Sequence, residues 1–376
     1  MTTLIDTVLI VGGGFSGMSA AIELRKRGVA VDLVEIDPGW RSYGAGISIG
    51  GPTLRAFRTL GILERFLVEG YACDGLDIFS QDGQLLTQVP TPRIAGEDVP
   101  GSGAIMRPVL ARILADATRV CGTSVRLGCT VTALEQHPDR VDVSFTDGSQ
   151  RRYDLVIAAD GLYSAMRERI LPDAPKPNYS GQGVWRAVLP RPAEITKTIL
   201  WVGSDVKVGL NPVSQDEMYL FVNENRPTNE YIPPEEFLPR LRGLLEPFSA
   251  AEVRQASAQL NEDSLVIYRP LEGLLVTQPW YQGRVVLIGD TVHATTPHLA
   301  SGACIGIEDA IVLAEELEAA ASLPSALQRF QQRRWERCRM VVQNSARLGE
   351  IEISGGDKQE HMRIMHDSFQ ALACPI

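Results

Sequence analysis

Three glycines and an acid near the N-terminus have the spacing of a dinucleotide-binding loop. Gly12, Gly14 and Gly17 form a G-x-G-x-x-G pattern after an apolar run at residues 8–11, and Glu35 follows 18 residues after the last glycine. In such a loop the first glycine permits a tight turn, the second lets a diphosphate approach the backbone, and the third lets a helix pack closely on a strand. The acid accepts hydrogen bonds from the ribose hydroxyls of an adenosine. The pattern therefore predicts dinucleotide binding rather than a simple glycine-rich turn.

Two arginines, Arg41 and Arg107, occur at positions where a nearby anion would account for a positive charge. Arg41 follows the expected second strand, and it is either an ordinary loop cation or a partner for the phosphate or adenosine of the nucleotide. Arg107 precedes Pro108 at the expected start of a helix, where the helix dipole disfavours a cation. An anion close to Arg107 would remove this conflict.

Two aspartates follow apolar runs that are typical of buried strands. Asp160-Gly161 comes after residues 155–159, and Asp290 comes after residues 284–288. Ligands of an open α/β sheet bind beyond the carboxyl ends of its strands, so both aspartates are candidates for ligand contact. For Asp160 the alternative is a plain strand–turn–helix in which Ser164 caps the helix.

The elements that must position these residues form a βαβ unit and a later insertion. Residues 16–27 carry apolar side chains at helical spacing between two expected strands. From about residue 172 to 268 strand-like runs dominate, with one helix-like piece at 234–245. An amphipathic helix begins near Gly302, and further helices follow it. We therefore expect an α/β fold in which an antiparallel sheet is inserted into a dinucleotide-binding domain.

The composition argues against several functional classes. The 376 residues are 44% apolar and 22% charged, as in ordinary globular proteins. A net charge of −10 argues against a nucleic-acid surface and against anionic membranes. No apolar run approaches the ~20 residues of a membrane span. The six cysteines are scattered without a C-x-x-C pair, so we expect a reduced, cytoplasmic setting and no metal site.

Three separated motifs occur in order: GGGFSG with Glu35, then ADGLYSAMR, then LIGDTVHATTP. Together they resemble the class A, single-component FAD-dependent aromatic hydroxylases of the p-hydroxybenzoate hydroxylase fold. The resemblance implies a Rossmann-like FAD-binding domain with an inserted antiparallel sheet and C-terminal helices. It also implies non-covalent FAD, NADH or NADPH as reductant, O2 as co-substrate, and hydroxylation of a small aromatic or heteroaromatic substrate through a flavin C4a-hydroperoxide.

The resemblance also implies roles for the cofactor residues. Those that would hold the cofactor are Gly12, Gly14, Gly17 and Glu35 on its ADP half, Arg107 near the diphosphate and ribityl chain, Asp160 and Gly161 on FAD and nicotinamide nucleotide, and Asp290 on the ribityl hydroxyls. The helix after Asp290 should direct its N-terminus to the flavin. This chain has Ala300-Ser301-Gly302 where many members have G-Q-G, so Gly302 keeps one flexible position.

The substrate residues are expected in the inserted sheet and after the third motif. The middle domain resembles members that act on salicylate-like acids or on urate, and the stretch VKVGLNPVSQDEMYLF is similar to the urate-hydroxylating branch. That resemblance implies Lys207 and Tyr219 as substrate contacts. Lys207 as a solvated strand residue is the alternative. Trp185-Arg186 is a second candidate pair for an anionic aromatic. His298 is a candidate hydrogen-bond donor or base toward the substrate, whereas we expect His293 to be structural.

The implied division of the chain has six segments: FAD-binding segments at 1–75, 101–172 and 271–320, a substrate-domain hairpin and connection at 76–100, a substrate sheet at 173–270, and C-terminal helices at 321–376. The alternatives are an epoxidase, a Baeyer–Villiger enzyme or a flavin reductase of C=C bonds on the same scaffold, and a non-catalytic flavin-binding protein. A plain NAD dehydrogenase shares only the first motif. The sequence leaves open the substrate, the choice of NADH or NADPH, and whether the protein is a monomer or a homodimer.

Overall fold

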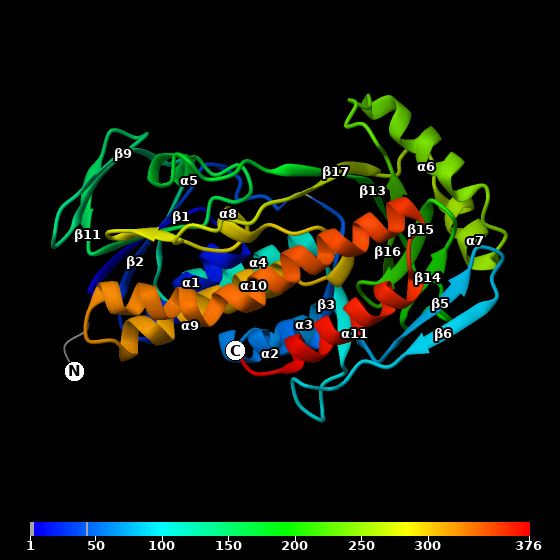
Figure 1. The fold of residues 1–376 in the computed structure, drawn as a ribbon, viewed down its shortest axis with the longest axis horizontal. Helices are drawn as coiled ribbons and strands as arrows, with labels where there is room; N and C mark the ends of the chain where they lie inside the picture. The colour runs from blue at the N-terminus through cyan, green and yellow to red at the C-terminus, as the bar shows by residue number, and fades with distance from the viewer. Residues whose placement is uncertain (1–3, 43) are drawn as a thin grey trace.

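The computed structural model describes residues 4–42 and 44–376, and two large sheets of different kinds dominate it (Figure 1). The first has six strands in the order β18-β19-β12-β1-β2-β8, parallel except for the edge pair β18 and β19. Its strands are β1 (Thr7–Val11), β2 (Ala30–Glu35), β8 (Ser124–Leu127), β12 (Leu155–Ala158), β18 (Tyr281–Gln282) and β19 (Val285–Leu287).

The centre of this parallel sheet consists of apolar strands that are buried on both faces. Every residue of β12 and of β19 is buried, and β1 is buried from Val8 onward. Such strands need a covering layer on each side, which helices provide. The helices that belong to this part are α1 (Phe15–Lys26), α2 (Gly51–Leu60), α3 (Leu63–Glu69), α4 (Arg107–Val120), α5 (Ala165–Ile170) and α8 (Asp290–His293).

Two small sheets accompany the parallel sheet. One, in the order β11-β10-β9, lies at the end of the molecule far from the second large sheet (Figure 1). The other, in the order β3-β7-β4, lies between the two large sheets, and β7 contacts β15 there. These strands are β3 (Gly46–Gly50), β4 (Tyr71–Cys73), β7 (Ser102–Met106), β9 (Val131–Gln136), β10 (Val141–Phe145) and β11 (Gln150–Tyr153).

The second large sheet has seven strands in the order β17-β13-β16-β15-β14-β5-β6. Its neighbours are antiparallel except for β14 and β5, which pair in parallel. Its strands are β5 (Leu76–Ser80), β6 (Leu85–Val89), β13 (Asn178–Pro190), β14 (Thr198–Val202), β15 (Val206–Pro212), β16 (Glu217–Asn225) and β17 (Ile267–Gly273). One face buries Trp185, Trp201 and Leu220 against Leu241 and Val253 of two helices.

The prediction of one helix in this insertion is wrong, because two helices cover the sheet. They are α6 (Phe237–Leu245), which follows the 3-10 turn η1 (Pro234–Glu236), and α7 (Ala251–Gln259). The sequence of α7 has few large apolar residues, and it buries only Val253 and Ala256. Its helical pattern was therefore too weak to stand out among the strands.

The opposite face of the seven-stranded sheet is turned toward the dinucleotide-binding part, and we call it the inward face. Residues that pair directly across antiparallel strands point to the same face. Arg186 pairs with Phe221, while Lys207 and Tyr219 lie in the neighbouring rows on the same side. Three of the predicted substrate residues therefore share the inward face.

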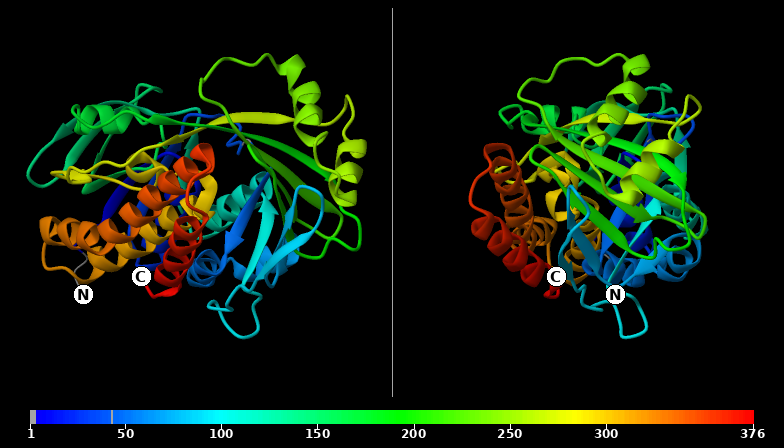
Figure 2. Two further views of the ribbon diagram at one scale, coloured as in Figure 1. Left: turned by 45° about the vertical axis from the view of Figure 1, so that its right-hand side comes forward. Right: turned by 90° about the vertical axis from the view of Figure 1, so that its right-hand side faces the viewer.

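Three helices form the C-terminal part of the fold. They are α9 (Gly302–Ala319), α10 (Leu323–Ser354) and α11 (Lys358–Ala373), and a 3-10 turn, η2 (Pro297–Leu299), precedes them. α9 packs on α1, and the 32-residue α10 runs from the parallel sheet to β13 of the seven-stranded sheet, as Figures 1 and 2 show. α11 then returns along α10 toward α2.

The predicted fold class is confirmed, with a parallel sheet, a largely antiparallel second sheet and C-terminal helices. The membership of β5 and β6 in the second sheet supports the proposed six-segment division, which stays a proposal. Within the described residues, no helix combines the length and the apolar character that a bilayer crossing demands.

Candidate functional site

The glycine loop has the geometry that its spacing predicts. Gly12 has a φ of 106°, and a Cβ on it would lie 2.3 Å from the carbonyl oxygen of Ala159. A Cβ on Gly17 would lie 2.1 Å from the carbonyl oxygen of Gly12, so only glycine lets α1 pack this closely on the loop. A Cβ on Gly14, by contrast, would meet no atom within 4 Å. Gly14 is also the N-cap of α1 without a side-chain cap, which leaves the N–H groups of the first turn for an anion.

Glu35 and Trp40 fasten this loop from the side of β2. The Glu35 carboxylate accepts the N–H of Gly13 at 2.7 Å and the N–H of Asp37 at 2.8 Å. The indole Nε1 of Trp40 donates to the carbonyl oxygen of Gly13 at 2.8 Å. An ionised carboxylate has further lone pairs, so these bonds are compatible with the predicted contact from Glu35 to ribose hydroxyls. Sequence reasoning missed Trp40, which has no motif of its own.

Two of the predicted cofactor residues are engaged by nearby protein groups. Arg41 forms an ion pair with Asp37 at 2.7 Å. Asp160 accepts from the Ser164 hydroxyl at 2.5 Å and from the N–H of Met166 at 3.0 Å. Ser164 in turn accepts the N–H of Arg167, which is the helix cap named above as the alternative. The cofactor roles of Arg41, Asp160 and Gly161 stay predictions.

Close contacts between three elements position Asp290. It follows Gly289, whose φ is 63°, at the start of α8. A Cβ on Gly289, or on Gly306 of α9, would lie 2.3 Å from the hydroxyl oxygen of Ser16 in α1. The aspartate therefore lies beside the first turn of α1. Although its side chain is exposed, the surrounding protein raises the pKa of Asp290 by desolvation, while His293 and Arg107 oppose this shift.

The N-terminus of α9 also lacks a side-chain cap. Its N-cap residue Ser301 donates its hydroxyl to the carbonyl oxygen of Leu299 at 2.7 Å, so this side chain does not bond the first turn. Ala300, before it, has a φ of 48°. The positive end of the α9 dipole at Gly302 is thus left for a ligand with negative charge.

The guanidinium groups of Arg107 and Arg186 lie near each other, where the inward face approaches the elements that are expected to bind the cofactor. Nε of Arg186 donates to the hydroxyl oxygen of Tyr219 at 3.2 Å. Burial, followed by the positive charge of Arg186, lowers the pKa of Arg107, and Asp290 opposes this shift. Arg107 therefore lies near both Arg186 and Asp290. Among the described residues, neither guanidinium has a carboxylate at ion-pair distance.

The prediction that Trp185 and Arg186 act as a pair is wrong. Adjacent residues of a strand point to opposite faces. The Trp185 ring is fully buried on the outer face, 4.6 Å from the Tyr268 ring and 5.6 Å from the Phe237 ring. Arg186 alone reaches the inward face.

Lys207 and His298 are brought together by a residue that sequence reasoning missed. Nζ of Lys207 lies 2.7 Å from Oε1 of Glu352 near the end of α10. His298 is buried, with Nδ1 at 2.9 Å from the Thr296 hydroxyl and Nε2 at 3.4 Å from Oε2 of Glu352. Burial lowers the pKa of His298, although Glu352 opposes the shift. The catalytic roles of His298, Lys207, Tyr219 and Arg186 stay predictions, and Glu352 joins two of these residues.

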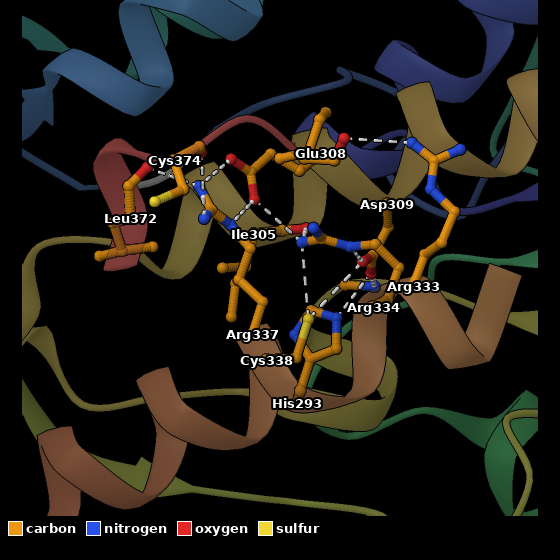
Figure 3. A network of polar contacts seen from close by, with 12 residues as sticks. His293, Ile305, Glu308, Asp309, Arg333, Arg334, Arg337, Cys338, Leu372 and Cys374 are labelled. Carbon is orange, nitrogen blue, oxygen red and sulfur yellow. Dashed lines mark hydrogen bonds and ion pairs between the residues drawn. The ribbon is translucent and has the colours of Figure 1, made fainter. Parts of the chain in front are cut away.

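A buried network of charged side chains connects α8, which begins at Asp290, with α9 and α10. Figure 3 shows its members His293, Asp309 and Arg334. Asp309 of α9 accepts the N–H of Gly289 at 2.9 Å and lies 2.5 Å from Nε2 of His293. Arg334 of α10 donates to Asp309 at 2.8 Å and to Glu308 at 3.0 Å. His293 is buried against Asp309 in this network, a position that fits the expected structural role. The signal in the sequence was the adjacent acid pair Glu308-Asp309 inside the apolar first part of this helix, residues 302–314.

The same network contains three groups that are close enough to share a cation. His293, Asp309 and Cys338 are buried, and their ligand atoms lie within 4.8 Å of one another. However, Arg334 donates to Asp309 at 2.8 Å and to the Cys338 sulfur at 3.5 Å. A divalent cation would have to share this site with a buried guanidinium, which charge repulsion opposes. The arrangement fits a compensated ion network better than a metal centre.

Comparison with known proteins identifies the family. A family model described as "FAD binding domain" matches residues 6–345. The chain belongs to this FAD-binding family. The aurachin C monooxygenase/isomerase of Stigmatella aurantiaca is 32% identical, over 92% of this chain and 89% of that protein. An FAD-dependent urate hydroxylase of Klebsiella oxytoca is 30% identical, over 89% of this chain and 87% of that protein.

A solved structure also matches over nearly the whole chain. The crystal structure of Klebsiella pneumoniae HpxO complexed with FAD and uric acid is 26% identical with a TM-score of 0.82, and the match covers 98% of this chain and 92% of that one. The predicted resemblance, the FAD cofactor and the class of FAD-dependent monooxygenases are confirmed by these comparisons.

Proposed function

We propose that this chain uses NAD(P)H and O2 to hydroxylate a small aromatic or heteroaromatic ring that carries an anionic group. The observation that carries the proposal is that Arg107 and Arg186 lie near each other, and that neither guanidinium has a carboxylate at ion-pair distance among the described residues. Two neighbouring positive charges favour an anion beside them, and a guanidinium can bind a planar carboxylate through two parallel N–H donors. Urate, which the name of one relative gives as its substrate, is itself a heteroaromatic anion.

The residues around the site fit FAD. The open side of Gly14 and the first turn of α1 would receive its diphosphate, and Glu35 its adenosine ribose. Asp290 would accept from the ribityl hydroxyls, and the N-terminus of α9 would face the flavin ring. Once bound and reduced by NAD(P)H, FAD supplies the activation of O2.

The chain's own residues would bind and orient the substrate. Arg186, held by the Tyr219 hydroxyl, would fix the anionic group of the ring. The rings of Tyr219 and Phe221, with centroids 5.3 Å apart, would provide an apolar wall that keeps water from the reacting carbon. The α9 dipole at Gly302 would stabilise negative charge on the reduced cofactor.

A panel of matched ligands tests the proposal. NADH and NADPH oxidation and O2 uptake by FAD-loaded protein are measured with aromatic carboxylates, their neutral amides, hydroxypyridines and purines. We expect an anionic aromatic to accelerate both rates and to yield a product heavier by one oxygen atom. Arg186→Gln should raise KM for that ligand by about tenfold, the loss of one charge-assisted contact. Stimulation by neutral ligands alone would contradict the anionic class, and NAD(P)H oxidation without O2 uptake would favour a reductase.

A further inference from the structure

A carboxylate from the C-terminal part of the chain reaches the inward face of the substrate sheet. Oε1 of Glu352 lies 2.7 Å from Nζ of Lys207 and 3.2 Å from Nε2 of His361, while Oε2 lies 3.4 Å from Nε2 of His298. The side chains of Lys207 and Glu352 are 23% and 22% exposed, so water screens this pair only partly. Glu352 is thus held by basic groups from three different elements.

The backbone around Glu352 is built for this close approach. Gly349 lies one turn earlier on α10, and a Cβ there would be 3.1 Å from both the His298 ring and the Gln182 amide oxygen. The amide of Asn225 on β16 approaches the backbone carbonyl of Glu352 at 3.5 Å. α10 therefore presses its last turns against the inward face, and Glu352 is placed there by packing from several sides.

Lys207 and Arg186 both lie on the inward face, but among the described residues only the charge of Lys207 is neutralised by a carboxylate. Burial alone would raise the pKa of Glu352, but Lys207, His298 and His361 outweigh it and hold the pKa well below its ordinary value. Glu352 is therefore ionised, and it neutralises Lys207. Arg186, one row further along the same face, has Tyr219 as its partner and no carboxylate among the described residues.

We propose that Glu352 determines substrate specificity by neutralising Lys207, which confines the anionic group of the substrate to Arg186 and leaves the Lys207 end for a neutral hydrogen-bonding group. This inference rests on the function proposed above. A free Lys207 would offer a second anion site, and substrates with a second anionic group would then gain affinity. Glu352 excludes them, because their second anion would face a carboxylate.

The test compares ligand binding by FAD-loaded wild-type protein and Glu352→Gln, read from the perturbation of the oxidised flavin spectrum without turnover. The probes are salicylate, its neutral amide, and 4-hydroxyisophthalate, which carries a second carboxylate. We expect Glu352→Gln to bind 4-hydroxyisophthalate about tenfold more tightly relative to salicylate, which corresponds to about 1.4 kcal/mol. The affinity for the amide should not change.

Two further variants keep the test decisive. Glu350→Gln is the matched control, because Glu350 lies on the same helix, is 65% exposed and pairs with Arg347. The double variant Lys207→Met/Glu352→Gln removes the whole pair, so the affinity for 4-hydroxyisophthalate relative to salicylate should return to within about twofold of the wild-type ratio. An unchanged ratio of the two carboxylates in Glu352→Gln would overturn the inference, as would a double variant that keeps the tenfold gain for 4-hydroxyisophthalate, which would show that the gain does not come from Lys207.

The same measurements separate this inference from the proposed function. If salicylate and 4-hydroxyisophthalate both bind to wild-type protein and only the Glu352→Gln ratio fails to change, the specificity role of Glu352 is wrong and the anionic substrate class stands. If neither carboxylate perturbs the flavin of the wild-type protein while the neutral amide does, the anionic class is wrong and the inference falls with it.

Discussion

Gly14 and Gly17 are three residues apart, yet their surroundings give them opposite sensitivities to substitution. A Cβ on Gly17 would collide with the backbone oxygen of Gly12 at 2.1 Å, whereas a Cβ on Gly14 would meet no protein atom within 4 Å. Gly17 therefore serves the packing of α1 on the loop. An alanine side chain at Gly14 would contact no protein group, so packing does not require glycine at this position. The close approach of the expected diphosphate to the backbone does.

We predict that alanine at these two positions separates stability from cofactor affinity. Gly17→Ala should lower the free energy of unfolding by about 1–3 kcal/mol because the helix must move away from the loop. Gly14→Ala should leave the stability of the FAD-free protein unchanged within about 0.5 kcal/mol and weaken FAD binding by at least about tenfold. Thermal unfolding of FAD-free protein and fluorescence titration with FAD measure the two quantities. Equal losses of stability in both variants would contradict the assignment.

The stability of the short helix α8 depends on the protonation of His293 as well as on packing. Burial opposes protonation of His293, but Asp309 and Cys338 outweigh it and raise the pKa of this histidine well above 6.5. A group whose folded pKa is raised contributes stability that is fully present below its unfolded pKa and is lost as the pH rises through the folded pKa. The protonated ring also balances the two carboxylates, Asp309 and Glu308, together with Arg334.

We therefore predict that the stability of the FAD-loaded protein falls as the pH rises above about 6.5, the ordinary value for histidine, and that His293 is responsible for much of the fall. His293→Gln should be less stable than wild type at pH 6 and should show a flatter dependence of unfolding free energy on pH between 6 and 9. Denaturant titrations at several pH values measure this dependence of the unfolding free energy on pH. His366→Gln, on the exposed side of α11, is the control and should keep the wild-type slope. A wild-type slope in His293→Gln would show that this histidine is neutral in the fold.

At the scale of elements, the sequence predicted what depends on local spacing. The glycine loop, the strands that end before Asp160 and Asp290, and the long helix after Gly302 were all visible as periodic patterns. The pairing of Lys207 with Glu352 was not visible, because these residues are separated by 145 positions and only the tertiary path of α10 joins them. The parallel pairing of β5 with β14 was missed for the same reason. The role given to Trp185 failed on a local point, since strand alternation alone places it opposite Arg186.

At the scale of the whole molecule, α10 and α11 tie the C-terminus back to the centre of the fold. Arg337 of α10 donates to both oxygens of Glu308 at 2.7 Å. It also donates to the carbonyl oxygen of Leu372 at 2.7 Å, near the end of α11 (Figure 3). A further bond goes to the carbonyl oxygen of Ala371 at 2.9 Å. A cation is favourable at a helix C-terminus, where the last carbonyls have no partner in the helix. One side chain thus links α9, α10 and α11.

We predict that Arg337→Met destabilises the protein by about 3 kcal/mol, because it leaves Glu308 with less compensation in a buried site and removes the donor from two carbonyls. The change should also loosen α11 more than the parallel sheet, which hydrogen exchange of the α11 amides would detect before any change in β1 or β12. Arg339→Met, two residues further along, is the matched control, because Arg339 is 40% exposed and pairs with the exposed Glu336. It should cost less than about 0.5 kcal/mol. Exchange that rises equally in α11 and in β1 would mean that α11 opens only together with the sheet, and that Arg337 stabilises the whole fold rather than securing the C-terminus.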